Sequence, residues 1–113
     1  MEATQFQKIA KALADPRRFE ILEVIAAAGT EMCCGDVVEC FHVAQATVSH
    51  HLKELTDSGL IETRSEGQFK YLRARPEVLA EYAAELQSRI ISPSGRRPAA
   101  SPKGASRKQS AKA

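Results

Sequence analysis

The sequence contains no tryptophan and only four phenylalanine and two tyrosine residues among its 113 residues. A large aromatic ligand pocket is therefore not expected. No apolar run approaches the ~18 residues that a membrane-spanning helix requires, and the first residues lack the apolar stretch of a secretory signal peptide. We therefore expect a cytoplasmic protein without a membrane partner. The three cysteines are expected to be reduced thiols in that compartment rather than a disulfide framework.

Acidic residues are absent from residues 92–113, which hold six of the 16 lysines and arginines. Residues 1–91 thus carry ten basic and 14 acidic side chains, a net charge of −4. The final segment is rich in Pro, Ser, Gly and Ala and cannot bury enough apolar surface to fold alone. We predict one folded domain over 1–91 and a disordered basic tail over 92–113. The tail is either a solvated terminus or a weak, salt-sensitive tether to phosphates.

Apolar residues at helical spacing predict two helices in the first part of the chain. The first helix is expected to start after Thr4. The second opens at Asp15-Pro16, an N-cap followed by a proline at the first helical position, and stops near Gly29. The apolar positions of these two helices are Phe6, Ile9, Ala10, Leu13, Phe19, Ile21, Leu22 and Ile25.

Two further helices follow, joined by a short break. The first is short and covers about residues 35–41, and the second covers residues 44–58 and ends at Gly59, a good left-handed C-cap. The apolar positions of this pair are Val37, Val38, Phe41, Val48, Leu52 and Leu55. Two helices joined by a tight turn form a helix-turn-helix, and we refer to residues 44–58 as the reading helix.

The hydrophobic period changes after residue 59. Residues 60–65 and 68–73 are two short strand-like runs on either side of Glu66-Gly67, which indicates a β-hairpin, or wing. Pro76 then opens a last helix whose broad apolar face has no later element to cover it. Such a face usually contacts a second copy of the chain in an isologous dimer. The fold class is therefore mainly α with a small β-hairpin (α+β), a winged helix-turn-helix.

Two long stretches resemble the ArsR/SmtB family of metal-responsive bacterial repressors. The run KALADPRRFEIL at 11–22 is similar to the second-helix signature of the family. The run VAQATVSHHLKELTDSGLIETRSEGQFKYLRA at 43–74 is similar to its reading helix and wing. The resemblance implies a homodimer, formed through the terminal helices, that binds a two-fold double-stranded DNA operator. It also implies that an effector lowers the affinity for DNA.

The reading helix has the residue types that groove recognition uses. If its apolar positions face the core, a polar face of small side chains is left for base contacts. Basic side chains of this helix and the wing are candidate phosphate contacts, and a glutamine at the wing tip could reach a neighbouring minor groove. The candidate DNA-binding residues are Gln45, Ala46, Thr47, Ser49, His50, Lys53, Arg64, Gln68, Lys70 and Arg73. Ala44 stands where the family often has a Ser cap, so the helix start lacks that cap.

Many family members bind arsenite or soft metals through a Cys-x-Cys pair at the start of the third helix. Here Cys33 matches the first ligand, but Gly35 stands at the second position and the other thiol is Cys34. These thiolates suit arsenite, antimonite or a soft divalent metal as an effector, with no obligatory cofactor. Cys40 is interpreted as a small buried core residue. The histidines (His42, His50 and His51) fit no closed metal site.

Two alternatives to a metal-released repressor stay open. The same repressor could lack a metal effector and respond to thiol oxidation, or to no ligand at all. A protein of another class, a winged-helix protein-interaction module, would show no sequence-specific DNA affinity. An enzyme is not expected, because no Ser-His-Asp or phosphate-loop pattern appears.

Overall fold

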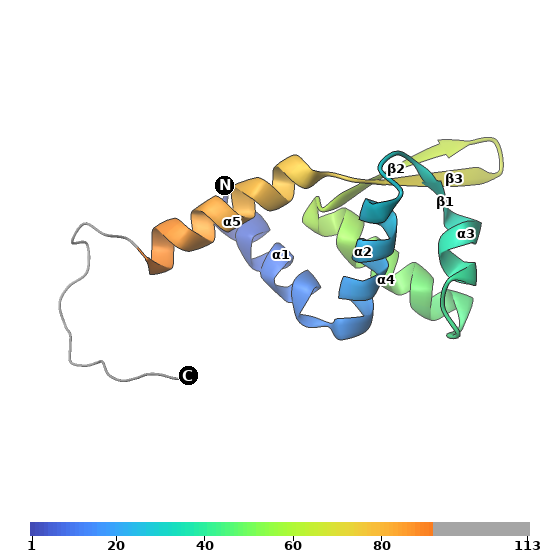
Figure 1. Cartoon of the computed structure of the whole chain (residues 1–113), viewed down its shortest axis with the longest axis horizontal. Helices are drawn as coiled ribbons and strands as arrows, with labels where there is room; N and C mark the ends of the chain where they lie inside the picture. The colour runs from blue at the N-terminus through green and yellow to red at the C-terminus, as the bar shows by residue number, and fades with distance from the viewer. Residues whose placement is uncertain (92–113) are drawn as a thin grey trace. The chain divides into compact units, whose positions relative to one another are not determined.

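The computed structural model describes residues 1–91 (Figure 1), so the predicted tail at 92–113 lies outside the described residues. The chain divides into two units, Met1–Tyr82 and Ala83–Ala113. The elements are α1 (Ala3–Ala14), α2 (Pro16–Ala27), β1 (Met32–Cys33), α3 (Cys34–Glu39), α4 (Gln45–Ser58), β2 (Ile61–Glu66), β3 (Phe69–Ala74) and α5 (Pro76–Ile90). The predicted order of helices and hairpin is confirmed, and one short strand is added.

The corner between α1 and α2 forms where the sequence predicts it. Asp15 is the N-cap of α2, and its side chain accepts a hydrogen bond from the backbone N–H of Arg18 (N to Oδ1, 3.0 Å). Pro16 follows at the first helical position, where its missing N–H costs nothing. The hydrogen bond from Arg18 stabilises the carboxylate and lowers the pKa of Asp15 below its ordinary value of 3.8.

The helix-turn-helix consists of α3 and α4. Ala44 is the N-cap of α4 and makes no side-chain cap hydrogen bond, as its lack of a polar side chain predicts. Its carbonyl accepts the first intrahelical bonds, from the N–H groups of Thr47 (3.0 Å) and Val48 (3.2 Å). At the other end Gly59 adopts the left-handed conformation (φ 90°) and ends the helix, which confirms the predicted C-cap.

Three antiparallel strands form the sheet, in the order β1-β3-β2. The hairpin of β2 and β3 turns at Gly67, whose φ of 62° a glycine adopts without strain. Strand β1 was not predicted, because two residues are too few to show an alternating pattern. It pairs with β3 at Met32↔Leu72 and Cys33↔Tyr71. The segment that contains the adjacent cysteines is therefore hydrogen-bonded directly to the wing.

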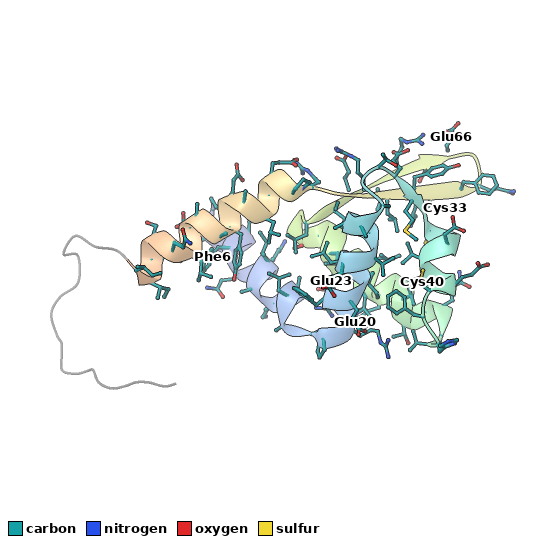
Figure 2. The ribbon with its side chains drawn as sticks, viewed as in Figure 1. Phe6, Glu20, Glu23, Cys33, Cys40 and Glu66 are labelled. Carbon is teal, nitrogen blue, oxygen red and sulfur yellow. The ribbon has the colours of Figure 1, made fainter. Side chains whose placement is uncertain are left out.

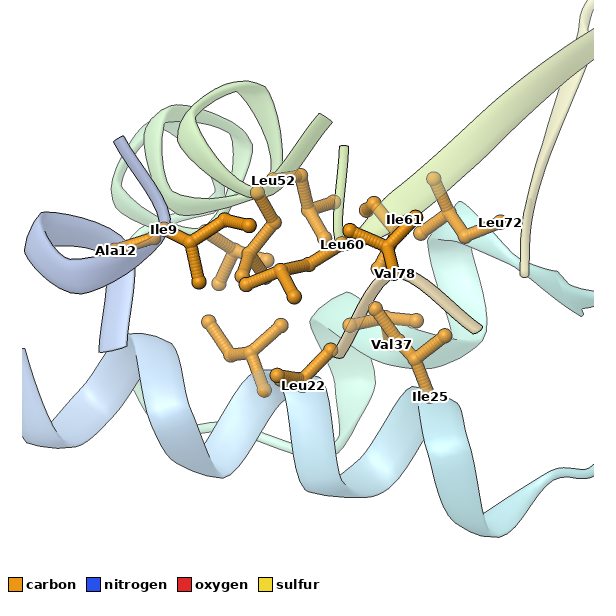
Figure 3. Close-up of a cluster of buried hydrophobic side chains, with 13 residues drawn as sticks. Ile9, Ala12, Leu22, Ile25, Val37, Leu52, Leu60, Ile61, Leu72 and Val78 are labelled. Carbon is orange, nitrogen blue, oxygen red and sulfur yellow. The ribbon is translucent and has the colours of Figure 1, made fainter. Parts of the chain in front are cut away.

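The core gathers apolar side chains from α1 to β3 and the first turn of α5 (Figure 3). Its members are Ile9, Ala12, Ile21, Leu22, Ile25, Val37, Val48, Leu52, Leu55, Leu60, Ile61, Leu72 and Val78. The assignment of Phe19 to the apolar face of α2 was wrong, because 44% of its surface is exposed. The buried residues of α2 are Ile21, Leu22 and Ile25, and Phe19 lies outside this stripe.

The first turns of α5 pack on the core. Val78 is buried, and the ring of Tyr82 lies 5.0 Å from the ring of Phe6. Leu79 is 42% exposed, and in the second unit Leu86 and Ile90 are also exposed. Among residues 1–91, no helix has both the length and the apolar character needed to cross a membrane.

Candidate nucleic-acid interface

Helix α4 has one buried and one exposed face. Val48 and Leu55 have no exposed surface and Leu52 is 5% exposed. All the predicted DNA-facing residues of this helix are exposed, namely Gln45, Ala46, Thr47, Ser49, His50 and Lys53. The predicted division of the helix into core and solvent faces is thus present, with amides, hydroxyls and an imidazole on the outside.

A groove runs between α4 and the wing. On the helix side it is lined by Ser49 and Lys53, and on the wing side by Thr63 and Lys70. Lys70 points toward α4 because it lies two residues before the buried Leu72 on β3, and alternate strand residues share a face. The inner face of the wing thus places Lys70 on the same side of the molecule as the exposed face of α4.

A second groove adjoins the first at the N-terminus of α4. Gln45 of α4 lines it together with Gln68 and Lys70 of the wing. Cys33 and Cys34 line it from the other side. Lys70 and Cys34 border both grooves. Residues Cys33 and Cys34 therefore lie beside three of the predicted DNA-binding residues. Cys33 pairs with Tyr71, so its side chain is on the outer face of the sheet, and Cys34 is the cysteine that borders both grooves.

The two arginines of the wing lie on its outer face. Arg73 follows the buried Leu72, and Arg64 pairs across the hairpin with Tyr71, so both point away from the groove. Arg64 contacts the carboxylates of Glu31 (2.8 Å) and Glu66 (2.6 Å), and its guanidinium lies 4.7 Å from the ring centroid of Tyr71. The hydrogen bond from Arg64 lowers the pKa of Glu31.

The predicted phosphate contacts thus fall into two groups. Arg73 is paired with Glu62, and Lys53 with Asp57 (Nζ to Oδ2, 3.0 Å), an interaction that raises the pKa of Lys53. Within residues 1–91 Lys70 makes no ion pair. Its ammonium group is therefore available to a phosphate without first leaving a carboxylate.

The adjacent cysteines flank the start of α3. Cys33 is the N-cap and Cys34 the first helical residue, and both are half-buried. Cys40 lies at the opposite end of α3 (Figure 2), where it is exposed and its thiol donates to the carbonyl of Asp36 (3.3 Å). The interpretation of Cys40 as a buried core residue was therefore wrong, because it follows the last helical turn, whose buried position is Val37.

The donor set around the thiols is incomplete. In the part of the chain that the structure describes, no three His, Cys, Asp or Glu side chains are grouped so that they could hold a metal ion. The fit to arsenite or a soft metal is therefore limited to the two adjacent thiolates. A third ligand would have to come from solvent or a second subunit.

His51, for which the sequence predicts no role, is only 7% exposed. Its Nδ1 accepts a hydrogen bond from Nε of Arg18 (3.2 Å), so it joins α4 to α2. Burial lowers its pKa below the ordinary value of 6.5. The signal was present in the spacing, since residue 51 lies between Val48 and Leu55 on the buried stripe of the helix.

Comparison with known proteins gives the same architecture. The model of a family described as a helix-turn-helix domain matches residues 13–64. The arsenical resistance operon repressor of Staphylococcus aureus is 33% identical over 97 residues, which cover 86% of this chain and 89% of the repressor. YceK, an uncharacterized HTH-type transcriptional regulator of Bacillus subtilis (strain 168), is 35% identical over 75 residues, 66% of this chain and 75% of YceK.

A solved structure extends the likeness to the fold. It is the solution NMR structure of a homodimeric winged helix-turn-helix DNA-binding domain from Mycobacterium bovis, described as a possible ArsR-family transcriptional regulator. It superposes with a TM-score of 0.61 at 26% identity, covering 86% of this chain and 89% of that domain.

The helix-turn-helix, the exposed polar face of its second helix and the hairpin that follows define a winged helix-turn-helix DNA-binding protein. With relatives that cover most of its length, its family is also clear. The chain belongs to the ArsR family of transcriptional repressors, which are regulators and not enzymes.

Proposed function

We propose that this protein is a cytoplasmic, homodimeric repressor that places α4 in the major groove of a two-fold operator. The observation that carries this proposal is the continuous surface formed by the exposed face of α4 and the inner face of the wing. A duplex lying along this surface meets Gln45 and Ser49 from the helix and Lys70 from the wing.

Different side chains of this surface are suited to contact bases and phosphates. An amide such as Gln45 can pair with adenine, hydroxyls such as those of Thr47 and Ser49 suit several bases, and Ala46 can contact a thymine methyl group. His50 adds a ring that can donate or accept. Lys53 and Lys70 are the proposed phosphate contacts, and Gln68 reaches toward the minor groove from the wing. Arg64 and Arg73 point away from the groove and are paired with carboxylates, so we assign them no phosphate. Of the two lysines, Lys70 requires less rearrangement.

Dimerisation follows from the exposed apolar residues of α5. Leu79 is 42% exposed in the first unit, and Leu86 is 40% exposed in the second unit. A second copy of the chain can cover these side chains by an isologous contact. The Mycobacterium bovis relative is homodimeric, which supports the same assembly here.

The effector is proposed to act on the adjacent thiols. The Staphylococcus aureus relative is a repressor of an arsenical resistance operon, which supports an arsenical effector. Cys33 and Cys34 border the groove that also contains Gln45 and Lys70. A bulky or charged adduct on Cys34, which borders both grooves, would therefore occupy space next to DNA-contacting side chains. Arsenite, antimonite or a soft divalent metal would be held by the two thiolates, and thiol oxidation is the alternative signal.

Fluorescence anisotropy of the protein's own promoter DNA tests this proposal. Reduced protein is titrated with and without arsenite, and Cys33→Ser and Cys34→Ser are compared with Cys40→Ser as a matched control at the other end of α3. We expect tight, sequence-specific binding that arsenite weakens in the wild type and in Cys40→Ser only. Binding that ignores arsenite would leave a repressor and remove the metal effector, and peroxide treatment would then test oxidation.

A further inference from the structure

A hydrogen bond links α2 to the reading helix on the side away from the DNA-facing residues. Nε of Arg18 donates to Nδ1 of His51 over 3.2 Å, and His51 is almost completely buried. Arg18 is itself held from two sides. Its backbone N–H donates to Asp15 (3.0 Å), and its Nη1 donates to the carbonyl of Lys11 in α1 (3.4 Å). One guanidinium therefore connects α1, α2 and α4.

We propose that the Arg18–His51 hydrogen bond positions the reading helix for DNA binding, and that protonation of His51 weakens that binding. The inference rests on the proposed role of α4 as the helix that contacts DNA. His51 directly follows the exposed His50 and lies one turn before Leu55, so it sits in the middle of the helix that bears the base contacts.

The Arg18–His51 hydrogen bond constrains the orientation of α4 in a way that the surrounding apolar contacts do not. Val48, Leu52 and Leu55 hold α4 by burial of apolar surface, which is non-directional. A hydrogen bond requires a defined distance and angle, so it fixes the rotation and height of α4 against α2. Base contacts on the opposite face need the same precision, because hydrogen bonds weaken steeply outside a narrow range of geometry.

Protonation would destroy this contact. A neutral imidazole accepts through one nitrogen, whereas the imidazolium has N–H groups at both nitrogens and no acceptor. The protonated ring would point an N–H at the donor Arg18 and place two positive charges side by side. Arg17 and Arg18 of α2 and His50 of α4 oppose that charge, and Asp15 at the start of α2 favours it. Burial is the largest influence and disfavours the imidazolium.

The expected pH dependence has an unusual sign. Above pH 6.5, the ordinary pKa of histidine, His51 is neutral and the contact is intact. Because the pKa of His51 is lowered, acidification protonates His51 only at a pH below 6.5, and the affinity for DNA falls there as α4 loosens. Protonation of exposed histidines near phosphates has the opposite effect, because added positive charge strengthens binding. A fall in DNA affinity with acid therefore indicates protonation of His51, whereas a rise indicates added positive charge at exposed histidines.

Anisotropy titrations of promoter DNA at constant salt, from about pH 8 to about pH 5.5, test the inference. The wild type is compared with His51→Asn, whose amide retains an acceptor but does not titrate, and with His50→Asn, an exposed neighbour on the same helix. We expect wild-type affinity to fall about ten-fold with acid, equivalent to about 1.4 kcal/mol. The affinity of His50→Asn should fall with acid as that of the wild type does. His51→Asn should bind like the wild type near pH 8, and its affinity should not fall with acid.

A second variant, Arg18→Gln, tests the same contact if His51→Asn does not fold. Arg18→Gln retains a donor but removes the positive charge that opposes protonation, so the midpoint of the acid-induced loss should move to higher pH. Circular dichroism at each pH confirms that the helices stay folded. Wild-type affinity that rises steadily with acid, or the same fall in His51→Asn as in the wild type, would overturn the inference. Specific binding by the wild type near pH 8 separately tests the DNA-binding function itself.

Discussion

Replacement of Lys70 by glutamine should change how DNA binding depends on salt. Lys70 lies on the inner face of the wing in the grooves beside α4, and within residues 1–91 it makes no ion pair. Its ammonium group can therefore neutralise a phosphate and release a counterion without breaking an existing contact. Arg64 differs, because it is already bound to the carboxylates of Glu31 and Glu66 on the outer face.

The size of the effect follows from the number of contacts. Each phosphate neutralised contributes about 0.9 to the slope of log affinity against log salt. A homodimer presents two copies of Lys70, so Lys70→Gln should lower the slope by about 1.8. Between about 0.05 M and about 0.2 M salt, wild-type affinity should then fall roughly 12-fold more than that of the variant.

Anisotropy titrations at four or more salt concentrations measure this slope directly. Arg64→Gln is the matched control in the same hairpin. It should lower affinity through loss of the Glu31–Arg64–Glu66 contacts and leave the slope nearly unchanged. Two results would refute the assignment of phosphate contacts to the inner face of the wing. One is a salt slope in Lys70→Gln equal to that of the wild type, and the other is a larger decrease of the salt slope in Arg64→Gln than in Lys70→Gln.

Three further predictions concern the fold and the tail. Gly59→Ala should lower the free energy of unfolding in urea by at least about 1 kcal/mol, because φ is 90° and the new Cβ would lie 2.8 Å from Nε2 of Gln5. Gly35→Ala, which meets no atom within 4 Å, should change little. Asp15→Ala should lower the Tm at neutral pH by removing the cap of α2. Since the pKa of Asp15 is lowered in the folded state, this cap is fully effective above pH 3.8 and is lost as pH falls through the pKa of the folded protein. The Tm values of the wild type and Asp15→Ala should therefore converge in acid. Truncation after residue 91 should reduce the salt slope of DNA binding if the tail is a tether, and an unchanged slope would exclude that role.

Local chemistry made most of the fold predictable. Asp15-Pro16 and Gly59 define helix ends by hydrogen bonding and by backbone conformation, and both effects depend on residues close in the sequence. The exposed face of α4 was also predictable, since three apolar residues at helical spacing fix which side is buried. Strand β1 could not be predicted, because its two residues are stabilised by pairing with a strand about 40 residues away.

Two residues that the sequence assigned to the core are exposed in the structure. Phe19 was assigned to the apolar face of α2, but the buried residues of this helix are Ile21, Leu22 and Ile25, and Phe19 is exposed. Cys40 was placed in the core by the general tendency of cysteine to be buried, but its position after the last turn of α3 exposes it. The ion pairs of Arg64 and Arg73 depend on strand register, which a single sequence does not specify.

Sequence-specific reading of DNA by α4 is tested most directly by comparing two duplexes at low salt, the protein's own promoter DNA and a scrambled duplex of the same composition. Anisotropy is measured for the wild type and for the double variant Gln45→Ala, Ser49→Ala, whose positions are exposed on α4. We expect the wild type to prefer the promoter by about a thousand-fold or more. The double variant should lose much of this preference while its affinity for the scrambled duplex is unchanged. Equal affinity of the wild type for the two duplexes would contradict sequence-specific reading by α4 and favour a protein-interaction module.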